Sequence, residues 1–132
     1  MVKQNKVFDK TLPEEETALL SLNGGLIVFA FNGVDVKKSW YGNWARANKR
    51  IKVRVPAGEA EIEFDIVYTV NNGYTSTTYT AKDQLIKYNL EAGKKYIISF
   101  ARKGGFLGFG SKMGVSLYED RKEIEFWEIH FR

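Results

Sequence analysis

The chain contains no cysteine, which excludes disulfide bonds and any chemistry that depends on a thiolate. It has one histidine, His130, so a metal site built from histidines and cysteines is excluded by count. A calcium site made of carboxylates alone needs acidic residues spaced along a loop, and the only acidic run is at 14–16. No metal and no cofactor are therefore expected.

Long apolar segments are also missing. The longest apolar run, 26–31, is far shorter than the stretch of about 20 residues that a membrane-spanning helix needs. The N-terminal residues 1–6 include no apolar segment after their charges, so no signal peptide is visible. We expect no membrane span, and a cytoplasmic protein by default, or an envelope protein if a signal peptide was removed.

What the chain does contain fits one soluble domain. Its 132 residues match the size of a single domain, 44% of them are hydrophobic and can form a core, and 27% are charged. The net charge of +4 permits an anionic partner without requiring one. Residues 1–13 are polar and end in Leu12-Pro13, so we expect a flexible N-terminal tail followed by one domain over 14–132.

Apolar and polar residues alternate over most of the chain, with the period of two that is typical of strands with one buried face. Turn residues divide this pattern into short strands at 17–22, 26–31, 34–37, 50–55, 60–70, 74–80, 85–90, 95–101, 113–119 and 123–131. The pattern predicts an all-β fold, either an antiparallel β-sandwich of the jelly-roll or immunoglobulin-like kind or a barrel. In the last segment, the apolar parity changes between Phe126 and Trp127, which indicates a bulge. Helical spacing of Ile124, Trp127 and Phe131 also fits a short C-terminal helix.

The segment 50–68 predicts a hairpin with one charged face. Apolar residues alternate on both sides of the turn 56–59, and an even-length turn keeps the two apolar sets on one side. The exposed face would then pair three basic residues with three acidic ones: Arg54 with Glu61, Lys52 with Glu63, and Arg50 with Asp65. Such a ladder fixes the register more than it adds stability, since each exposed pair contributes only about 0.2–1 kcal/mol.

Glycine positions predict three further turns. Asn32-Gly33 is a strong type I′ signal, and it places Phe31 opposite Val34. Residues 71–73 form the next turn. Between 85 and 100, the apolar residues on the two sides of the last turn match only if the loop has odd length, which requires a positive φ at Gly93.

The strand from Tyr74 to Thr80 is rich in threonine and polar on both faces, which predicts the edge of a sheet. It contains no lysine or proline that would block pairing with another chain. We therefore expect a protein partner, or self-association of the protein, at this strand.

The longest irregular connection, 37–49, combines basic and aromatic side chains. Such side chains can stack on bases, contact sugars or lie at a membrane surface. As a binding site, the loop would present aromatic anchors with a basic rim, formed by Trp40, Tyr41, Trp44, Lys37, Lys38 and Arg46. The alternative is that Trp40 and Trp44 cap one end of the sandwich.

A glycine-rich segment, 105–110, has spacing similar to that of a phosphate-binding loop. Ser111 and Lys112 follow in the reverse order, however, and no helix is predicted after them. The alternatives are a connection whose aromatic side chains pack on the core, or an interaction loop. No Gly-x-Ser-x-Gly motif accompanies His130, and a lone histidine between Ile129 and Phe131 is typical of a structural position, so no enzyme is expected.

The order of the predicted strands separates these two loops. If every connection reverses the chain, the loop 37–49 shares its end of the domain with the turns 23–25, 71–73, 91–94 and 120–122. The glycine-rich connection 102–112 then lies at the opposite end, together with 32–33 and 56–59. This prediction depends on the number of strands, because one strand more or less reverses it.

The order of the turn motifs also carries a resemblance. An apolar strand leads to Asn32-Gly33, then to the turn around Pro56 and Gly58, then to the segment Leu90-Glu-Ala-Gly93-Lys-Lys-Tyr96. Over residues 17–101 this order resembles PEGA-like and similar small β-sandwich modules of bacterial envelope proteins. The resemblance implies a binding or scaffolding module without catalytic residues.

Two functions follow from these observations. The first is a noncatalytic binding or assembly module that acts through protein–protein interaction. The alternative is a nucleic-acid or anionic-surface binder that uses the basic and aromatic loop 37–49. Salt dependence separates the two, because contacts to phosphates weaken steeply as salt rises.

Overall fold

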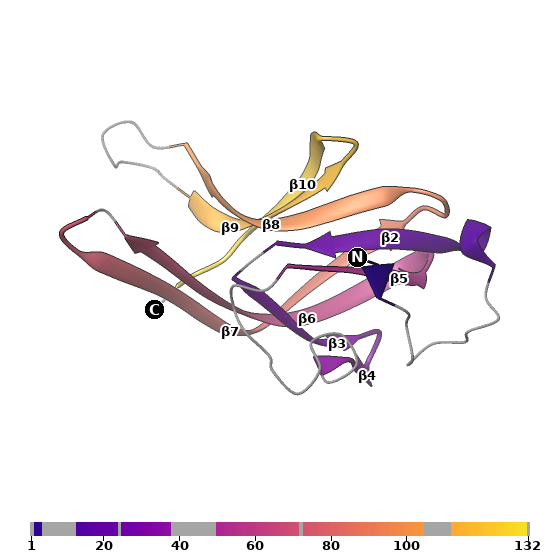
Figure 1. Cartoon of the computed structure of the whole chain (residues 1–132), viewed down its shortest axis with the longest axis horizontal. Coiled ribbons are helices and arrows are strands. Elements are labelled where there is room, and N and C mark those ends of the chain that lie inside the picture. Colours follow the sequence, from indigo (N-terminus) through magenta and orange to yellow (C-terminus); the bar gives the residue numbers. More distant parts are fainter. Residues whose placement is uncertain are drawn as a thin grey trace.

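Two β-sheets pack face to face in the computed structural model, which describes residues 2–3, 13–23, 25–37, 50–71, 73–104 and 112–131 (Figure 1). The prediction of an all-β sandwich is confirmed. The six-stranded sheet has the order β1 (Val2–Lys3), β5 (Ile51–Pro56), β2 (Thr17–Leu22), β8 (Lys95–Lys103), β9 (Lys112–Glu119) and β10 (Lys122–Glu128). The four-stranded sheet has the order β4 (Val34–Asp35), β3 (Leu26–Phe31), β6 (Gly58–Asn71) and β7 (Ser76–Leu90). A single turn of 3-10 helix, η1 (Glu14–Glu16), precedes β2.

The core lies between the two sheets and is built from the alternating apolar positions of each strand. The burial of β5 alternates residue by residue, and β6 alternates in the same way over its first ten residues. The largest fully buried side chains come from both sheets: Tyr96, Phe31, Phe64, Leu20, Leu22, Leu26, Ile62, Ile66, Leu90 and Ile98. Period-two patterning therefore identified the buried face of these strands correctly.

The predicted charged hairpin is wrong, because β5 and β6 belong to different sheets. β5 pairs with β2, where Arg54 lies opposite Leu19, whereas β6 pairs with β3 and with β7, where Glu61 lies opposite Lys87. The turn after Pro56 is a corner that carries the chain across the core, with Gly58 at φ +108°. A corner keeps both apolar faces turned toward one core, as a hairpin does, so parity of the apolar residues could not separate the two.

The predicted pairing of 85–90 with 95–100 is wrong for the same reason. β7 lies in the four-stranded sheet, and β8 lies in the six-stranded sheet, where it runs parallel to β2. The predicted positive φ at Gly93 is confirmed at +77°. The Gly93 N–H donates to the carbonyl oxygen of Thr17 at 2.9 Å, which ties this second corner to the start of β2.

One continuous strand, β7, replaces the two predicted at 74–80 and 85–90. At the predicted break, the register against β6 shifts between Phe64 and Ile66, and Asp83 takes a φ of +57°. Asp65 Oδ1 accepts a hydrogen bond from the Asp83 N–H at 2.9 Å, which holds this bulge in place. The polar residues around Asp83 therefore mark a bulge within a strand and not a turn between strands.

Four strands, β5 to β8, lie between the two loops in place of the five predicted, and this reverses the predicted arrangement of the loops. β5 begins opposite Leu22 at the end of β2, and β8 runs parallel to β2, so β5 begins and β8 ends at the same end of the six-stranded sheet. The described residues that flank the loops 37–49 and 102–112 therefore share one end, against the prediction. The turns 91–94 and 120–122 lie at the other end.

Three other predictions concern turns and termini. The Asn32-Gly33 hairpin is confirmed, with Phe31 opposite Val34 and positive φ at both turn residues.

The last segment is a strand, β10, and the short C-terminal helix is not present in 112–131. Its bulge lies between Glu123 and Glu125, three residues before the predicted position. In the N-terminal tail, Val2–Lys3 pair with β5 in parallel.

Candidate functional site

The predicted binding loop is described at only one of its six candidate residues. Lys37 is exposed, and its backbone N–H donates to Asp35 Oδ1 at 3.0 Å. The other five candidates, Lys38, Trp40, Tyr41, Trp44 and Arg46, lie outside the described residues, as does the glycine-rich segment 105–110. Binding of nucleic acid or of an anionic surface by this loop stays a prediction.

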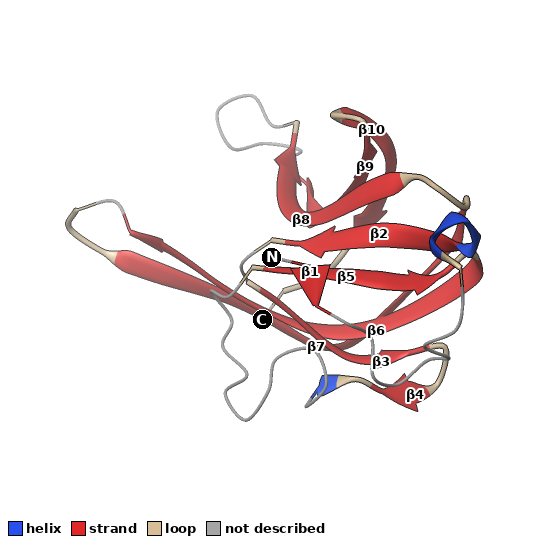
Figure 2. Ribbon diagram, turned by 45° about the vertical axis from the view of Figure 1, so that its right-hand side comes forward, coloured by secondary structure: helices blue, strands red, loops and turns tan. Residues whose placement is uncertain are grey.

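The described residues offer a different candidate, a ribbon formed by the far ends of β6 and β7. Figures 1 and 2 both show this ribbon extending beyond the ends of the other described strands. The ladder between β3 and β6 ends at Leu26 and Ile66, whereas the pairing of β6 with β7 continues to Asn71 and Ser76. We call the residues 69–71 and 73–78 the arm.

Four aromatic side chains hold the base of the arm against the body of the sandwich. Tyr68 stacks on Phe100 with a centroid distance of 4.3 Å. Tyr79 contacts Phe100 at 6.3 Å and Phe131 at 6.0 Å, and these last two rings meet edge to face at 5.6 Å. We call Tyr68, Tyr79, Phe100 and Phe131 the aromatic clamp, because it joins both strands of the ribbon to β8 and to the C-terminal residues.

Beyond the clamp, every described residue of the arm is exposed, on both faces of the ribbon. Val70 is 44% exposed and Tyr74 is 98% exposed. The pairing within the arm includes a hydrogen bond between the Thr69 and Thr78 hydroxyls at 2.9 Å. From Ile66 to Ala81 the sequence contains no charged residue, although 27% of the whole chain is charged.

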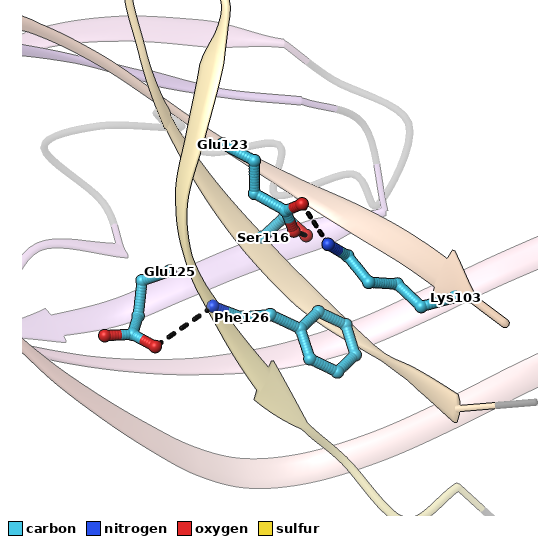
Figure 3. Close-up of polar contacts among 5 residues, drawn as sticks. All are labelled: Lys103, Ser116, Glu123, Glu125 and Phe126. Carbon is cyan, nitrogen blue, oxygen red and sulfur yellow. Dashed lines mark hydrogen bonds and ion pairs between the residues drawn. The ribbon is translucent and has the colours of Figure 1, made fainter.

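A second feature is a polar cluster on the outer face of β8, β9 and β10 (Figure 3). Ser116 is fully buried, and its hydroxyl donates to Glu123 Oε1 at 2.5 Å. Lys103 forms an ion pair with the other oxygen of this carboxylate, and its ammonium group lies 5.3 Å from the centroid of the Phe126 ring. The hydrogen bonds from Lys103 and Ser116 lower the pKa of Glu123.

This cluster has the geometry of a structural contact. A serine that acts as a nucleophile must be accessible and must give its proton to a base, whereas the Ser116 hydroxyl is buried and a carboxylate with a lowered pKa is a weak base. The contact joins β8 to β10 across β9, and Figure 2 shows these three strands bent away from the rest of the sandwich. We interpret the cluster as a tie that holds this bend.

The outward charges of β5 and β6 have opposite sign and lie on different sheets. The outward residues of β5, with Arg50 just before it, are Arg50, Lys52 and Arg54. The outward residues of β6 are Glu59, Glu61, Glu63 and Asp65. The sequence placed these two sets opposite one another, where they would neutralise each other, and the structure separates them.

A groove runs along β2 on the basic face. The outward side chains of β2 are short, and longer side chains of β5 and β8 rise on either side of them. Two adjoining hollows of about 320 and 390 Å³ follow the strand and share Leu19 and Lys95. The larger hollow is lined by residues that include Leu19 and Ser21 of β2, Arg50 and Lys52 on the side of β5, and Lys95 and Ile97 on the side of β8.

Comparison with known proteins does not assign a function to these surfaces, and neither do searches for a metal-binding group and for a membrane-spanning helix. Comparison with protein-family models, with curated proteins and with solved structures finds no match for the chain, so the resemblance to PEGA-like modules stays a prediction. Within the described ranges, no group of three or more His, Cys, Asp or Glu side chains could hold a metal ion. None of the helices in the described part of the chain has the length and the apolar composition that crossing a membrane requires.

Sequence reasoning found the edge strand but missed the arm and the groove. β7 is an edge of the four-stranded sheet, as predicted for 74–80. The signal for the arm was available, since the uncharged stretch extends over both strands of the hairpin. The groove was missed because two of its basic side chains, Arg50 and Lys52, are paired with β6 in the predicted charge ladder.

Proposed function

We propose that the protein is a noncatalytic assembly module that joins a second copy of itself through the arm. The observation that carries this proposal is an uncharged ribbon that is exposed on both faces and extends beyond the core. A two-stranded ribbon without further packing is at best marginally stable in water. A third and fourth strand, supplied by another copy, would cover its edge and extend the sheet.

The edge of β7 is open to such pairing in the arm and protected elsewhere. In the part that follows the arm, Lys82 and Lys87 are exposed, and the bulge at Asp83 interrupts a flat edge. Charged residues and bulges are the usual means by which an edge strand avoids another chain. The arm has neither, which supports pairing at Ser76–Thr78 of two copies related by a two-fold axis. This contact is small, so the dimer is weak and depends on concentration.

Sedimentation of the wild-type protein over a wide concentration range tests the proposal. We expect the average mass to rise from monomer toward dimer, with increased protection of the Thr77 amide from hydrogen exchange. In the variant Thr77→Lys, the two copies would bring like charges together where their arms pair, so the mass should stay that of the monomer.

The matched control is Asn89→Lys, which adds the same charge to an exposed position on the protected part of the same strand. It should associate as the wild type does. A wild-type protein that stays monomeric at all concentrations contradicts the proposal, and so does a Thr77→Lys variant that dimerises normally.

A further inference from the structure

The groove along β2 is formed by three neighbouring strands, β5, β2 and β8. β2 turns Leu19 and Ser21 outward from the middle of the six-stranded sheet, between β5 on one side and β8 on the other. Adjacent strands lie about 4.8 Å apart, so the flanking side chains stand roughly 10 Å apart across the floor. That width accommodates one extended polypeptide chain.

The sides of this groove carry positive charge that is available to a partner. Among the described residues, no carboxylate lies within ion-pair distance of Arg50, Lys52 or Lys95, and all three are exposed. Other basic residues nearby are engaged. Arg54 pairs with Glu14 at 2.8 Å, and Lys94 lies between Glu119 at 3.5 Å and Glu91 at 3.7 Å, whose charges raise the pKa of this lysine.

The floor distinguishes between two classes of anionic partner. Single-stranded nucleic acid is held by aromatic side chains on which the bases stack, combined with basic residues along the backbone. The one aromatic residue that lines the larger hollow, Tyr96, is buried in the core, and the uncharged outward residues of the lining include Leu19, Ser21 and Ile97, the last 37% exposed. Aliphatic side chains of a peptide can pack on such a floor, while alternate carboxylates reach the sides.

We propose that this groove binds an extended acidic segment of a partner protein, in which carboxylates alternate with aliphatic residues. The carboxylates contact Lys52 and Arg50 on one side and Lys95 on the other, and the aliphatic side chains lie on Leu19 and Ile97. Lys52 lies opposite Ser21, and Ser21 lies opposite Ile97, so at this level the groove has a charged residue on the side of β5 and an apolar residue on the side of β8. This surface is separate from the arm, and the inference does not depend on the proposed dimer.

The test is titration of the full chain with a short blocked peptide that alternates glutamate with valine, at low and at high salt. We expect saturable binding that weakens as salt rises, because the contacts lie at an exposed rim. The double variant Lys52→Glu with Lys95→Glu should weaken binding by about tenfold or more. The variant Ser21→Trp leaves the charge unchanged and fills the floor, and it should also weaken binding.

The matched control reverses two exposed lysines elsewhere, Lys82→Glu with Lys122→Glu, and so changes the net charge by the same amount. It should bind the peptide as the wild type does, and thermal melting should show that all variants are folded. Equal loss in this control would mean that net charge alone drives binding, which contradicts a groove. Absence of peptide binding at low salt also contradicts the inference, as does binding of an oligothymidylate at the groove in place of the peptide.

Discussion

The two parts of strand β7 differ in almost every respect. The part in the arm, from Ser76 to Thr78, is uncharged, exposed on both faces and paired only with β6 among the described strands. The part from Ala81 to Leu90 carries charge, contains the bulge at Asp83, and buries one face in the core. Between them, the aromatic clamp holds the strand where it leaves the sandwich.

This difference indicates that the two parts are stabilised by different means. The inner part is held by apolar burial, since Ile86 and Leu90 are almost completely enclosed. No side chain of the arm is buried, so apolar burial contributes little to the stability of the arm. A strand can therefore be continuous in its backbone while its stability changes abruptly along its length.

The comparison predicts the largest effect at the inner part of β7. Leu90→Ala should lower the free energy of unfolding by about 3 kcal/mol, because it leaves a cavity in the core. Thr77→Ala, in the arm, should change it by less than about 0.5 kcal/mol. Chemical denaturation of both variants at a concentration where the protein is monomeric measures the two values. If both variants lose the same free energy of unfolding, the arm contributes as much to stability as the core, which contradicts the comparison.

A smaller effect is predicted at the clamp. Phe100→Ala removes a ring that contacts Tyr68, Tyr79 and Phe131, and we expect a loss of about 2 kcal/mol. Hydrogen exchange of the arm amides should accelerate more than that of β2 or β9, because the base of the ribbon is no longer held.

Tyr88→Ala provides the control for the clamp, since Tyr88 makes edge contacts of 6.3 Å with both Tyr96 and Trp127, away from the arm. It should destabilise the protein without a selective change in the arm. If exchange in the arm of Phe100→Ala rises only in proportion to that of the whole sandwich, the clamp does not control the arm.

The sequence predicted the strands and their buried faces far better than it predicted their partners. Asn32-Gly33 was assigned correctly because its turn geometry is local and needs positive φ at both residues. The turns around Gly58 and Gly93 were assigned as hairpins and proved to be corners between sheets. Local turn chemistry and parity of the apolar residues are the same in both cases, so the partner strand is decided by packing that a single sequence does not display.

The candidate surfaces depended directly on those partners. Because Arg54 and Glu61 lie in different sheets, the basic residues of β5 are separated from the acidic residues of β6 and line the groove along β2. The bulge at Asp83 had a comparable effect, because counting it as a turn reversed the ends to which the loops were assigned. The prediction that 74–80 lies at the edge of a sheet is correct in spite of these two errors, because it was made from the composition of the segment and not from its partner strand.

The smallest predicted effect is a change with pH in the stability that Glu123 contributes to the body of the sandwich. Hydrogen bonds from Lys103 and Ser116 lower the pKa of Glu123 below its ordinary value of 4.5. A carboxylate whose pKa is lower in the folded state stabilises that state above its ordinary pKa, and this stabilisation is lost as pH falls through the lowered pKa. The contribution is modest because the pair is partly exposed to solvent.

We therefore expect Glu123→Gln to have a lower Tm than the wild type at neutral pH, by less than either preceding change. The difference should shrink as the pH falls below 4.5 and the wild-type carboxylate becomes protonated. Glu125→Gln is the control, because Glu125 is exposed and its described contact is to the neighbouring Phe126 N–H at 3.2 Å. Exchange of the arm amides should not respond to either substitution. A Tm difference that stays constant through the acidic range would show that the Lys103–Glu123–Ser116 contact does not stabilise the bend through the charge of Glu123.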